Sequence, residues 1–225
     1  MMSGTLYIVA TPIGNLGDIT FRAIETLKAV DLIACEDTRH TKILLSRYNI
    51  DKPLTSYFEH NKIQKTRYLL SVLKEGKNVA LVSDAGTPGI SDPGFKIIKE
   101  AIENSIDIQA LPGASALVTA LILSGAPTDS FTFAGFLPNK TAARKKKLLE
   151  FKGGKRTVLI YESPHRVLAT LRDILDVLGD IKAACVREAT KKFEEVKREK
   201  VSALLSHFEK TAPRGEFVIV FNPTK

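Results

Sequence analysis

The sequence lacks the long apolar runs and clustered cysteines that mark membrane proteins and disulfide-stabilised proteins. None of its 225 residues lie in a run that approaches the roughly 18 apolar residues of a membrane span. The amino-terminal stretch has neither a basic leader nor a long apolar segment, so we expect no signal peptide and a cytosolic protein. Cys35 and Cys185 each lie in an apolar run, which favours buried free thiols over a disulfide or a metal site.

Several catalytic and nucleotide-binding signatures are also absent. No GxGxxG follows a predicted strand and no GxxxxGKS/T occurs, so neither a dinucleotide fingerprint nor a P-loop supports a nucleotide enzyme. The histidines show no HExxH or cysteine–histidine spacing, so we predict no metal site. No GxSxG nucleophile elbow is present either. A ligand site must therefore be sought in loops without these signatures.

Surplus positive charge is missing from the first half of the chain and concentrated in the second. Residues 1–112 contain 13 basic and 13 acidic side chains, whereas residues 113–225 contain 20 and 12, which accounts for the net charge of +8. The segment 140–156 alone has eight basic residues and one acid, Glu150. A solvated helix face explains one lysine run, but a neutral half joined to a basic half indicates a polyanionic partner, and nucleic acid is favoured.

Short apolar runs alternate with amphipathic segments along the chain. The runs that predict strands are 6–10, 31–35, 54–58, 79–82, 106–111, 131–136, 157–161, 183–186 and 215–221. This alternation predicts an α/β fold with a largely parallel sheet covered on both faces. The length allows one large domain or two small ones, and we favour an N-terminal α/β domain (1–112) and a basic C-terminal α/β domain (113–225).

The stretch VSDAGTPGISDPG, residues 82–94, combines glycines and prolines directly after a predicted strand. Its glycines allow close backbone approach and its prolines fix φ, so the loop is stiff and shaped. Ligands of open α/β sheets bind at such strand ends. Asp92 before Pro93 is typical of a helix N-cap. Asp84 has no such structural role and can accept hydrogen bonds from a polar ligand.

Other strand-end loops complete the candidate site. The loops around Gly14 and Gly86 can admit a flat polar molecule, and the free N–H groups of PGAS at the start of the apolar helix 113–125 suit a carboxylate or phosphate. The basic residues Arg39, Arg166, Arg187 and Lys191 lie in similar loops and can contact phosphates. The residues alone thus predict a small-molecule site flanked by a polyanion site.

These loops resemble a known motif series. The matching segments are VATPIGNLGDIT (9–20), EDTR (36–39), SDAGTPGISDPG (83–94), PGASA (112–116), YESPHR (161–166) and REATK (187–191). Their order and extent are similar to the ribosomal small subunit methyltransferase I family, a branch of the tetrapyrrole-methylase-like, class III methyltransferases. The resemblance implies two α/β domains with a cleft for S-adenosylmethionine between them, a homodimer, and 2′-O-methylation of a cytidine in 16S rRNA of the small ribosomal subunit.

The resemblance also implies a set of cofactor-binding residues. They are Pro12, Ile13, Gly14, Asp84, Ala85, Gly86, Thr87, Ser115, Ala116, Tyr161 and Ala189. The segment TPIGNLGDIT differs from the GxGDPxxLT of the tetrapyrrole enzymes, and this departure puts the role of Asp18 in question. The missing proline after Asp84 agrees with the RNA branch. Three of these residues also have a purely structural interpretation: Ser115 as a helix cap, Tyr161 as a core residue, and Ala189 as the end of a strand.

Methyl transfer to a ribose needs the acceptor oxygen aligned with the C–S bond and water excluded. A protonated hydroxyl is a poor nucleophile, so a general base helps. The candidates are Glu162, Glu188 and His165, and a salt bridge with Arg166 or Arg187 is the alternative for either glutamate.

The RNA backbone is expected to contact a set of basic side chains. They are Arg39, Lys145, Lys146, Lys147, Arg166, Arg187 and Lys191. Binding should weaken steeply with salt, and the target cytidine must be unstacked to react. Two other interpretations stay open: a tetrapyrrole methylase, against which the basic half and SDAGTPG argue, and a non-catalytic RNA-binding ribosome-assembly factor.

Overall fold

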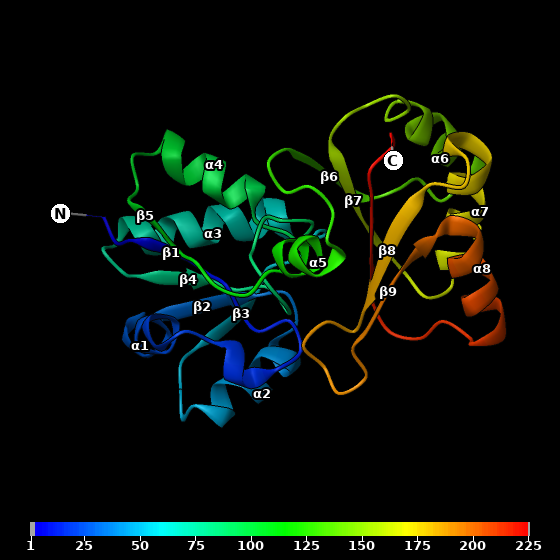
Figure 1. Cartoon of the computed structure of the whole chain (residues 1–225). Helices are drawn as coiled ribbons and strands as arrows, with labels where there is room; N and C mark the ends of the chain where they lie inside the picture. Colours follow the sequence, from blue (N-terminus) through cyan, green and yellow to red (C-terminus); the bar gives the residue numbers. More distant parts are fainter. Residues whose placement is uncertain (1–2, 225) are drawn as a thin grey trace. The chain divides into compact units, whose positions relative to one another are not determined.

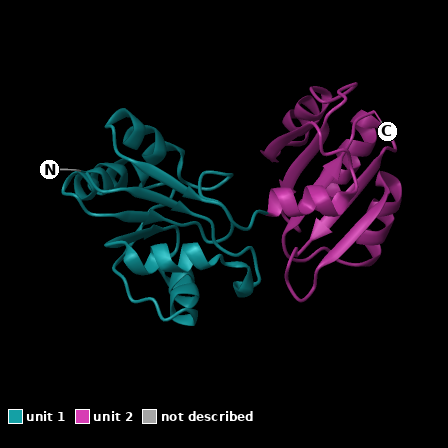
Figure 2. Ribbon diagram, turned by 60° about the vertical axis from the view of Figure 1, so that its left-hand side comes forward, with its two compact units in different colours: residues 1–115 teal, residues 116–225 magenta. Residues whose placement is uncertain are grey.

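The computed structural model describes residues 3–224 and divides at residue 115 into two compact units, each of which combines helices with one sheet (Figures 1 and 2). The expected boundary after residue 112 lies in the same connecting segment. Cys35 and Cys185 are buried free thiols, as predicted. Within residues 3–224 no helix is long and apolar enough to cross a membrane.

Unit 1 is built on a parallel sheet of five strands. They are β1 (Leu6–Val9), β2 (Leu32–Cys35), β3 (Leu54–Ser56), β4 (Val79–Leu81) and β5 (Ile108–Leu111), in the order β3-β2-β4-β1-β5. The helices are α1 (Phe21–Ala29), α2 (Thr38–Arg47), α3 (Lys62–Lys74) and α4 (Phe95–Glu103), with a 3-10 turn, η1 (Leu16–Asp18). Leu27 and Leu45 pack on one face of the sheet, and Leu73 and Ile97 pack on the other. Both faces are covered, which explains the nearly continuous apolar strands.

The strand order of unit 1 creates a ligand-binding position. β1 and β4 are neighbours, but the chain leaves β1 toward β2 and leaves β4 toward β5, in opposite directions across the sheet. Open α/β sheets bind ligands at such a switch point, outside the carboxyl ends of the strands. The loops that follow β1, β2, β4 and β5 therefore meet at one edge.

Unit 2 has a mixed sheet. Its strands are β6 (Phe131–Phe136), β7 (Thr157–Glu162), β8 (Lys182–Arg187), β9 (Glu195–Lys200) and β10 (Phe217–Phe221), in the order β6-β7-β10-β8-β9. Only the β6–β7 pair is parallel in the part that the structure describes. The expectation of a largely parallel sheet is therefore wrong here. β8 and β9 are joined by a loop without a helix, and so short a connection allows only antiparallel pairing.

The helices of unit 2 cover the two faces of this sheet unequally. α5 (Ala116–Ser124) packs on one face through Ala120 and Leu121. The other face is covered by α6 (Thr141–Leu149), α7 (Val167–Leu178) and α8 (Val201–Lys210). A single nine-residue helix on one side leaves part of that face without a helical cover.

Two helices begin after a proline, and the start of α4 differs from the sequence-based expectation. The N-cap of α4 is Gly94 and not Asp92, and no side chain caps the helix. α7 begins at Val167, after a turn in which the N–H groups of Arg166 and Val167 donate to the carbonyl of Ser163. In both places the proline occupies the preceding turn instead of the first helical turn.

Candidate cofactor and substrate site

The loops after β1 and β4 are hydrogen-bonded to each other. The N–H of Thr11 donates to Gly86 O at 2.9 Å, and the N–H of Gly86 donates to Thr11 O at 3.0 Å. The Thr11 hydroxyl also donates to Ser83 O at 3.0 Å. Gly86 has φ +80°, and a Cβ there would lie 3.4 Å from Ile13 and 3.8 Å from the carbonyl of Ala114. The loops after β1, β4 and β5 thus converge on a backbone that favours glycine.

The loop after β5 is held against the same strand ends. A Cβ on Gly113 would lie 2.8 Å from the Cβ of Ala10, so only glycine lets the two backbones approach this closely. The Thr87 hydroxyl donates to Ala114 O at 3.4 Å. The sequence-predicted residues Pro12, Ile13, Gly14, Asp84, Ala85, Gly86, Thr87 and Ser115 lie in these three loops. The structure brings this subset together.

Asp84 joins the β4 loop to the β2 loop. Its Oδ1 accepts a hydrogen bond from the N–H of Asp37 at 3.1 Å. The carboxylate of Asp37 in turn accepts from Nε (3.2 Å) and Nη2 (2.8 Å) of Arg39, and these bonds hold the pKa of Asp37 well below its ordinary value. The Arg39 side chain is 89% exposed, so its outer edge still faces solvent.

Glu36 is a half-buried carboxylate that sequence reasoning did not single out. It directly follows β2 and precedes the Asp37–Asp84 contact. Burial and the negative charges of Asp84 and Asp92 raise its pKa. Within residues 3–224 it has no hydrogen-bond or ion-pair partner, and no acidic, histidine or cysteine cluster there is arranged to hold a metal. The sequence signal that could have singled out Glu36 is its position directly after an apolar run that forms a buried strand.

Glu162 and Arg166 form a closed network in unit 2. Glu162 is 2% exposed, and its oxygens accept from the Thr170 hydroxyl at 2.6 Å and from the N–H of Ser163 at 2.8 Å. Arg166 Nε lies 3.3 Å from the same carboxylate, and its Nη2 donates to Leu137 O at 2.6 Å. Both side chains tie the β6 and β7 loops together, which is the salt-bridge alternative that the sequence left open.

Glu188 is bound in a second network. Its Oε1 accepts from Nζ of Lys191 and from the N–H of Glu216, both at 2.9 Å, and although burial opposes the effect, these bonds lower its pKa. Arg187 donates to Arg214 O at 2.7 Å and to Glu195 at 3.3 Å. A carboxylate with a lowered pKa is a weak proton acceptor. The geometry therefore favours structural roles for these side chains over the predicted catalytic and RNA-binding ones.

The remaining predicted residues of unit 2 are divided between core and surface. Tyr161 packs edge-to-face on Phe133 (4.8 Å between ring centroids) and on Phe136 (5.8 Å), beside Ala189 in the apolar cluster under α5. Ala116 starts α5 and packs on the same cluster. His165 is exposed in the turn before α7.

The lysine run on α6 is less available than its sequence indicates. Lys145 lies 2.5 Å from Asp176, and Lys147 lies 2.6 Å from Glu150. Lys146 is exposed, and no ion pair is formed by it within the described residues. One of the three predicted lysines is thus fully open to an outside phosphate.

Comparison with known proteins decides the family. The profile of the tetrapyrrole (corrin/porphyrin) methylases matches residues 5–205. The chain belongs to this family. Within it, the chain is 49% identical over 219 residues to "Ribosomal RNA small subunit methyltransferase I" of Thermotoga maritima, with 97% of this chain and 98% of the relative covered. A Synechocystis protein of the same name is 50% identical over 218 residues, 96% and 78% of the two chains.

Solved structures of tetrapyrrole methylases and related proteins share the fold. Cobalt precorrin-4 methyltransferase superposes with a TM-score of 0.73 at 18% identity, over 97% of this chain and 94% of that chain. Diphthine synthase gives 0.72 at 16% identity, over 97% and 90%. The predicted α/β methylase fold and the resemblance to the methyltransferase I family are confirmed.

As a family member the protein is a methyltransferase that uses S-adenosylmethionine. The residues of unit 1 fit that molecule. The glycine backbones at Gly86 and Gly113 allow close approach, and the buried Ser83 hydroxyl has no partner within the described chain. The carboxylates of Glu36 and Asp84 suit a ligand with positive sulfonium and ammonium groups. Which residues contact the cofactor stays a prediction.

Proposed function

We propose that the protein methylates the ribose 2′-oxygen of a cytidine in 16S rRNA of the small ribosomal subunit. The supporting observation is the identity of about half the residues, over nearly the whole chain, with proteins named ribosomal RNA small subunit methyltransferase I. The excess of basic side chains in residues 113–225 fits a polyanionic substrate. The tetrapyrrole-acting structures are below 20% identical and support the fold alone.

The protein's main contribution to the chemistry is positioning. When bound, S-adenosylmethionine supplies an already electrophilic methyl group. The converging loops around Gly86, Ile13 and Ala114 hold the donor and exclude water. Asp84 keeps the β2 and β4 loops in register through the N–H of Asp37. This places the acceptor hydroxyl beside a fixed set of loops.

Glu36 accepts the proton of the ribose hydroxyl in this proposal. It lies at the carboxyl edge of the sheet next to the Asp84 loop, and its oxygens are open. A base whose pKa lies above the ordinary carboxyl range holds a transferred proton better than a strongly stabilised carboxylate does. Glu162 and Glu188 already accept two or more hydrogen bonds within unit 2.

Arg39 and Lys146 are the exposed cations that contact the RNA backbone in this proposal. Arg39 belongs to the EDTR motif and Lys146 to the basic segment 140–156, and both side chains are exposed. We also propose a homodimer that acts on ribosomal particles in the cytosol.

Methyl transfer to small subunits tests the proposal directly. Tritiated S-adenosylmethionine and subunits from a strain that lacks the modification should give labelled 16S rRNA, with alkali resistance at one cytidine because the 2′-oxygen is blocked. A porphyrin or precorrin substrate should take no label. Label in the base, or in the tetrapyrrole alone, contradicts the proposal. Calorimetry without any heat for S-adenosylmethionine would instead favour a non-catalytic RNA-binding factor.

A further inference from the structure

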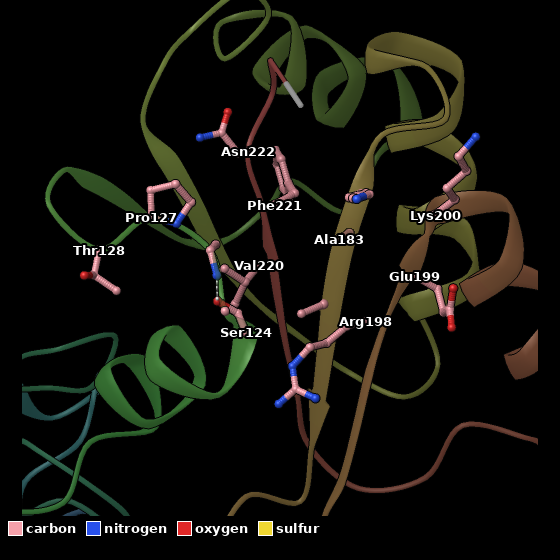
Figure 3. Close-up of a pocket in the computed structure, with 14 residues that line it drawn as sticks. Ser124, Pro127, Thr128, Ala183, Arg198, Glu199, Lys200, Val220, Phe221 and Asn222 are labelled. Atoms are coloured by element: carbon pink, nitrogen blue, oxygen red, sulfur yellow. Dashed lines mark hydrogen bonds between the residues drawn. The ribbon is translucent and has the colours of Figure 1, made fainter.

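Unit 2 contains a cavity of about 940 Å³ where α5 stops covering the sheet (Figure 3). α5 ends at Ser124, and the loop 125–128 forms one wall. The remaining wall and floor come from the first residues of β8 and the last residues of β9 and β10. The lining residues used below are Pro127, Lys182, Ala184, Arg198, Glu199, Lys200 and Val220.

The strand register places three cations on one face of the sheet. Lys182 pairs with Lys200 across β8 and β9, and Ala184 pairs with Arg198. Alternate residues of a strand share a face, and Ala184 belongs to the cluster under α5. Lys182, Arg198 and Lys200 therefore all project from the α5 side of the sheet.

This arrangement of charge is unfavourable without an anion. Like charges directly opposite each other on neighbouring strands repel. Neither Lys182 nor Lys200 forms an ion pair within the described chain, although the charge of Lys200 helps to lower the pKa of Asp180, which accepts hydrogen bonds from Ser202. Arg198 uses Nε to donate to Leu123 O at the end of α5. Glu199 also lines the cavity, but its register partner Ala183 faces the side of the sheet opposite to α5. The Glu199 side chain therefore projects from the other face than the three cations.

We propose that this cavity binds a phosphate and its attached nucleoside from the ribosomal RNA, and that this nucleotide is not the methylated cytidine. The cations face the phosphate, and Ala184, Val220 and Pro127 offer an apolar surface to the nucleoside. The volume lies within the range of small-ligand pockets, on the order of 300–1,000 Å³. The inference rests on the proposed function, because it names a second contact for the same RNA.

The position of the cavity makes it a separate anchor. β8 runs from the cavity at Lys182 to the REATK loop after Arg187, and β7 ends beside that loop at Glu162. Six strand residues span about 17 Å. An RNA strand held at the cavity can thus reach the YESPHR and REATK loops of unit 2 over a few nucleotides.

A second copy of this chain is a less suitable occupant. Interfaces between protein subunits are depleted in lysine at their centres, whereas this cavity has two exposed lysines and an arginine at its mouth. Nucleic-acid sites are rich in such side chains, and unit 2 has the basic surplus of the chain.

The test removes two charges and compares the result with a matched pair. Lys182→Ser/Lys200→Ser is measured beside Lys197→Ser/Lys210→Ser. Lys197 lies on β9, and its register partner on β8 is Cys185, which faces the side of the sheet opposite to α5. Lys210 is the last residue of α8, which covers that same side. Filter binding of deproteinised 16S rRNA is recorded as a function of KCl concentration, together with calorimetry for S-adenosylmethionine.

We expect the cavity variant to bind 16S rRNA about tenfold more weakly, with a salt slope smaller by about 0.7, because the one phosphate in the cavity loses its two lysine partners. Its affinity for S-adenosylmethionine should match that of the wild type. The Lys197/Lys210 variant should keep most of the slope. Equal losses in the two variants overturn the cavity assignment while leaving the methylase proposal intact.

Two further outcomes also overturn the assignment. Cytidine 5′-monophosphate bound by the wild type and not by the cavity variant, with RNA binding unchanged, indicates a free nucleotide ligand. A change in sedimentation from dimer to monomer in the cavity variant indicates an interface between copies. Failure of the wild type itself to methylate 16S rRNA in small ribosomal subunits rejects the proposed function instead.

Discussion

Unit 1 and unit 2 are both layered α/β structures, but they differ in whether their half-buried charged side chains have bonding partners. At the carboxyl edge of unit 1, Glu36 is half-buried and the Ser83 hydroxyl is buried, and neither has a partner among residues 3–224. In unit 2, buried or half-buried charges such as Glu162, Arg144 and Arg187 are bonded within the unit. An unpaired buried polar group costs stability, so a ligand that bonds to Glu36 or Ser83 would stabilise this edge. Within the described chain, unit 2 also has two buried polar atoms without a hydrogen bond, Arg166 Nε and the Thr190 hydroxyl, but each belongs to a residue of the bonded loops.

The sheets explain part of this difference. All strands of unit 1 are parallel, so their following loops gather at one edge and leave polar groups there. In unit 2 the antiparallel strands divide the loops between two edges, one with the YESPHR and REATK loops and one with the cationic cavity. The comparison therefore supports the proposal that catalysis belongs to unit 1 and that most of the RNA contact belongs to unit 2.

The most severe test of the comparison is Glu36→Gln. If Glu36 takes the proton, kcat should fall by about 10² to 10⁴, the range for a lost general base. Burial and the neighbouring carboxylates raise the pKa of Glu36, so its ionised form is disfavoured in the folded protein at pH 7. The variant should therefore also melt at a higher temperature at pH 7, and this gain should vanish at acidic pH, where Glu36 is protonated in both states.

The pH profile and a control complete this test. The kcat of the wild type should fall as pH falls through the raised pKa of Glu36. Glu25→Gln, an exposed change on α1, should alter neither kcat nor melting. A Glu36→Gln enzyme with full activity would remove Glu36 from the mechanism and weaken the contrast between the units.

Arg144→Ala should have a large effect on stability and none on cofactor affinity. The Nε of Arg144 lies 2.6 Å from Oδ2 of Asp173, and the two side chains are 3% and 8% exposed. Removing Arg144 leaves the buried Asp173 with Lys145 Nζ, 3.8 Å away, as its remaining cation, and breaking such a buried pair costs about 3–5 kcal/mol. Chemical denaturation measures the loss. Arg172→Ala, which breaks the exposed pair with Glu209, should cost at most about 1 kcal/mol.

Local sequence patterns predicted the strand positions and the glycine loops of unit 1. Gly86 and Gly113 could be recognised because a tight turn or a close approach needs a particular residue type, which is visible in one loop at a time. The parallel sheet of unit 1 followed from alternating strands and helices. The position of β10 between β7 and β8 did not follow, because pairing of distant strands leaves no local signal.

Charge pairing was the least predictable feature of the site. The run Lys145–Lys147 indicates an RNA-binding stripe, yet Lys145 contacts Asp176 on another helix. Arg166 likewise donates to Leu137 O, 29 residues away. Such contacts depend on the packing of separate elements, so the sequence showed which charges exist but not which are free.

Gly86→Ala should have an intermediate effect centred on the cofactor. At φ +80° a side chain costs about 1–2 kcal/mol of folding free energy, and the added Cβ lies against Ile13. We expect affinity for S-adenosylmethionine to fall about tenfold, because the loop must shift. Gly153→Ala is the matched control, since φ is +76° with open space around it. Calorimetry should show unchanged cofactor affinity for Gly153→Ala. If the two variants lose cofactor affinity equally, backbone strain alone explains the effect of Gly86→Ala.

Lys146→Ala should give the smallest effect, and its comparison with Lys145→Ala shows which lysine of α6 contacts RNA. Its ammonium has no partner in residues 3–224, so losing one phosphate contact should lower the salt slope of RNA binding by about 0.7. Lys145 must leave Asp176, 2.5 Å away, before it can reach a phosphate, so Lys145→Ala should change the slope less. Equal salt slopes for the two variants would mean that an RNA phosphate displaces Asp176 from Lys145. The ion pairs on the surface of unit 2 would then not prevent their lysines from binding RNA.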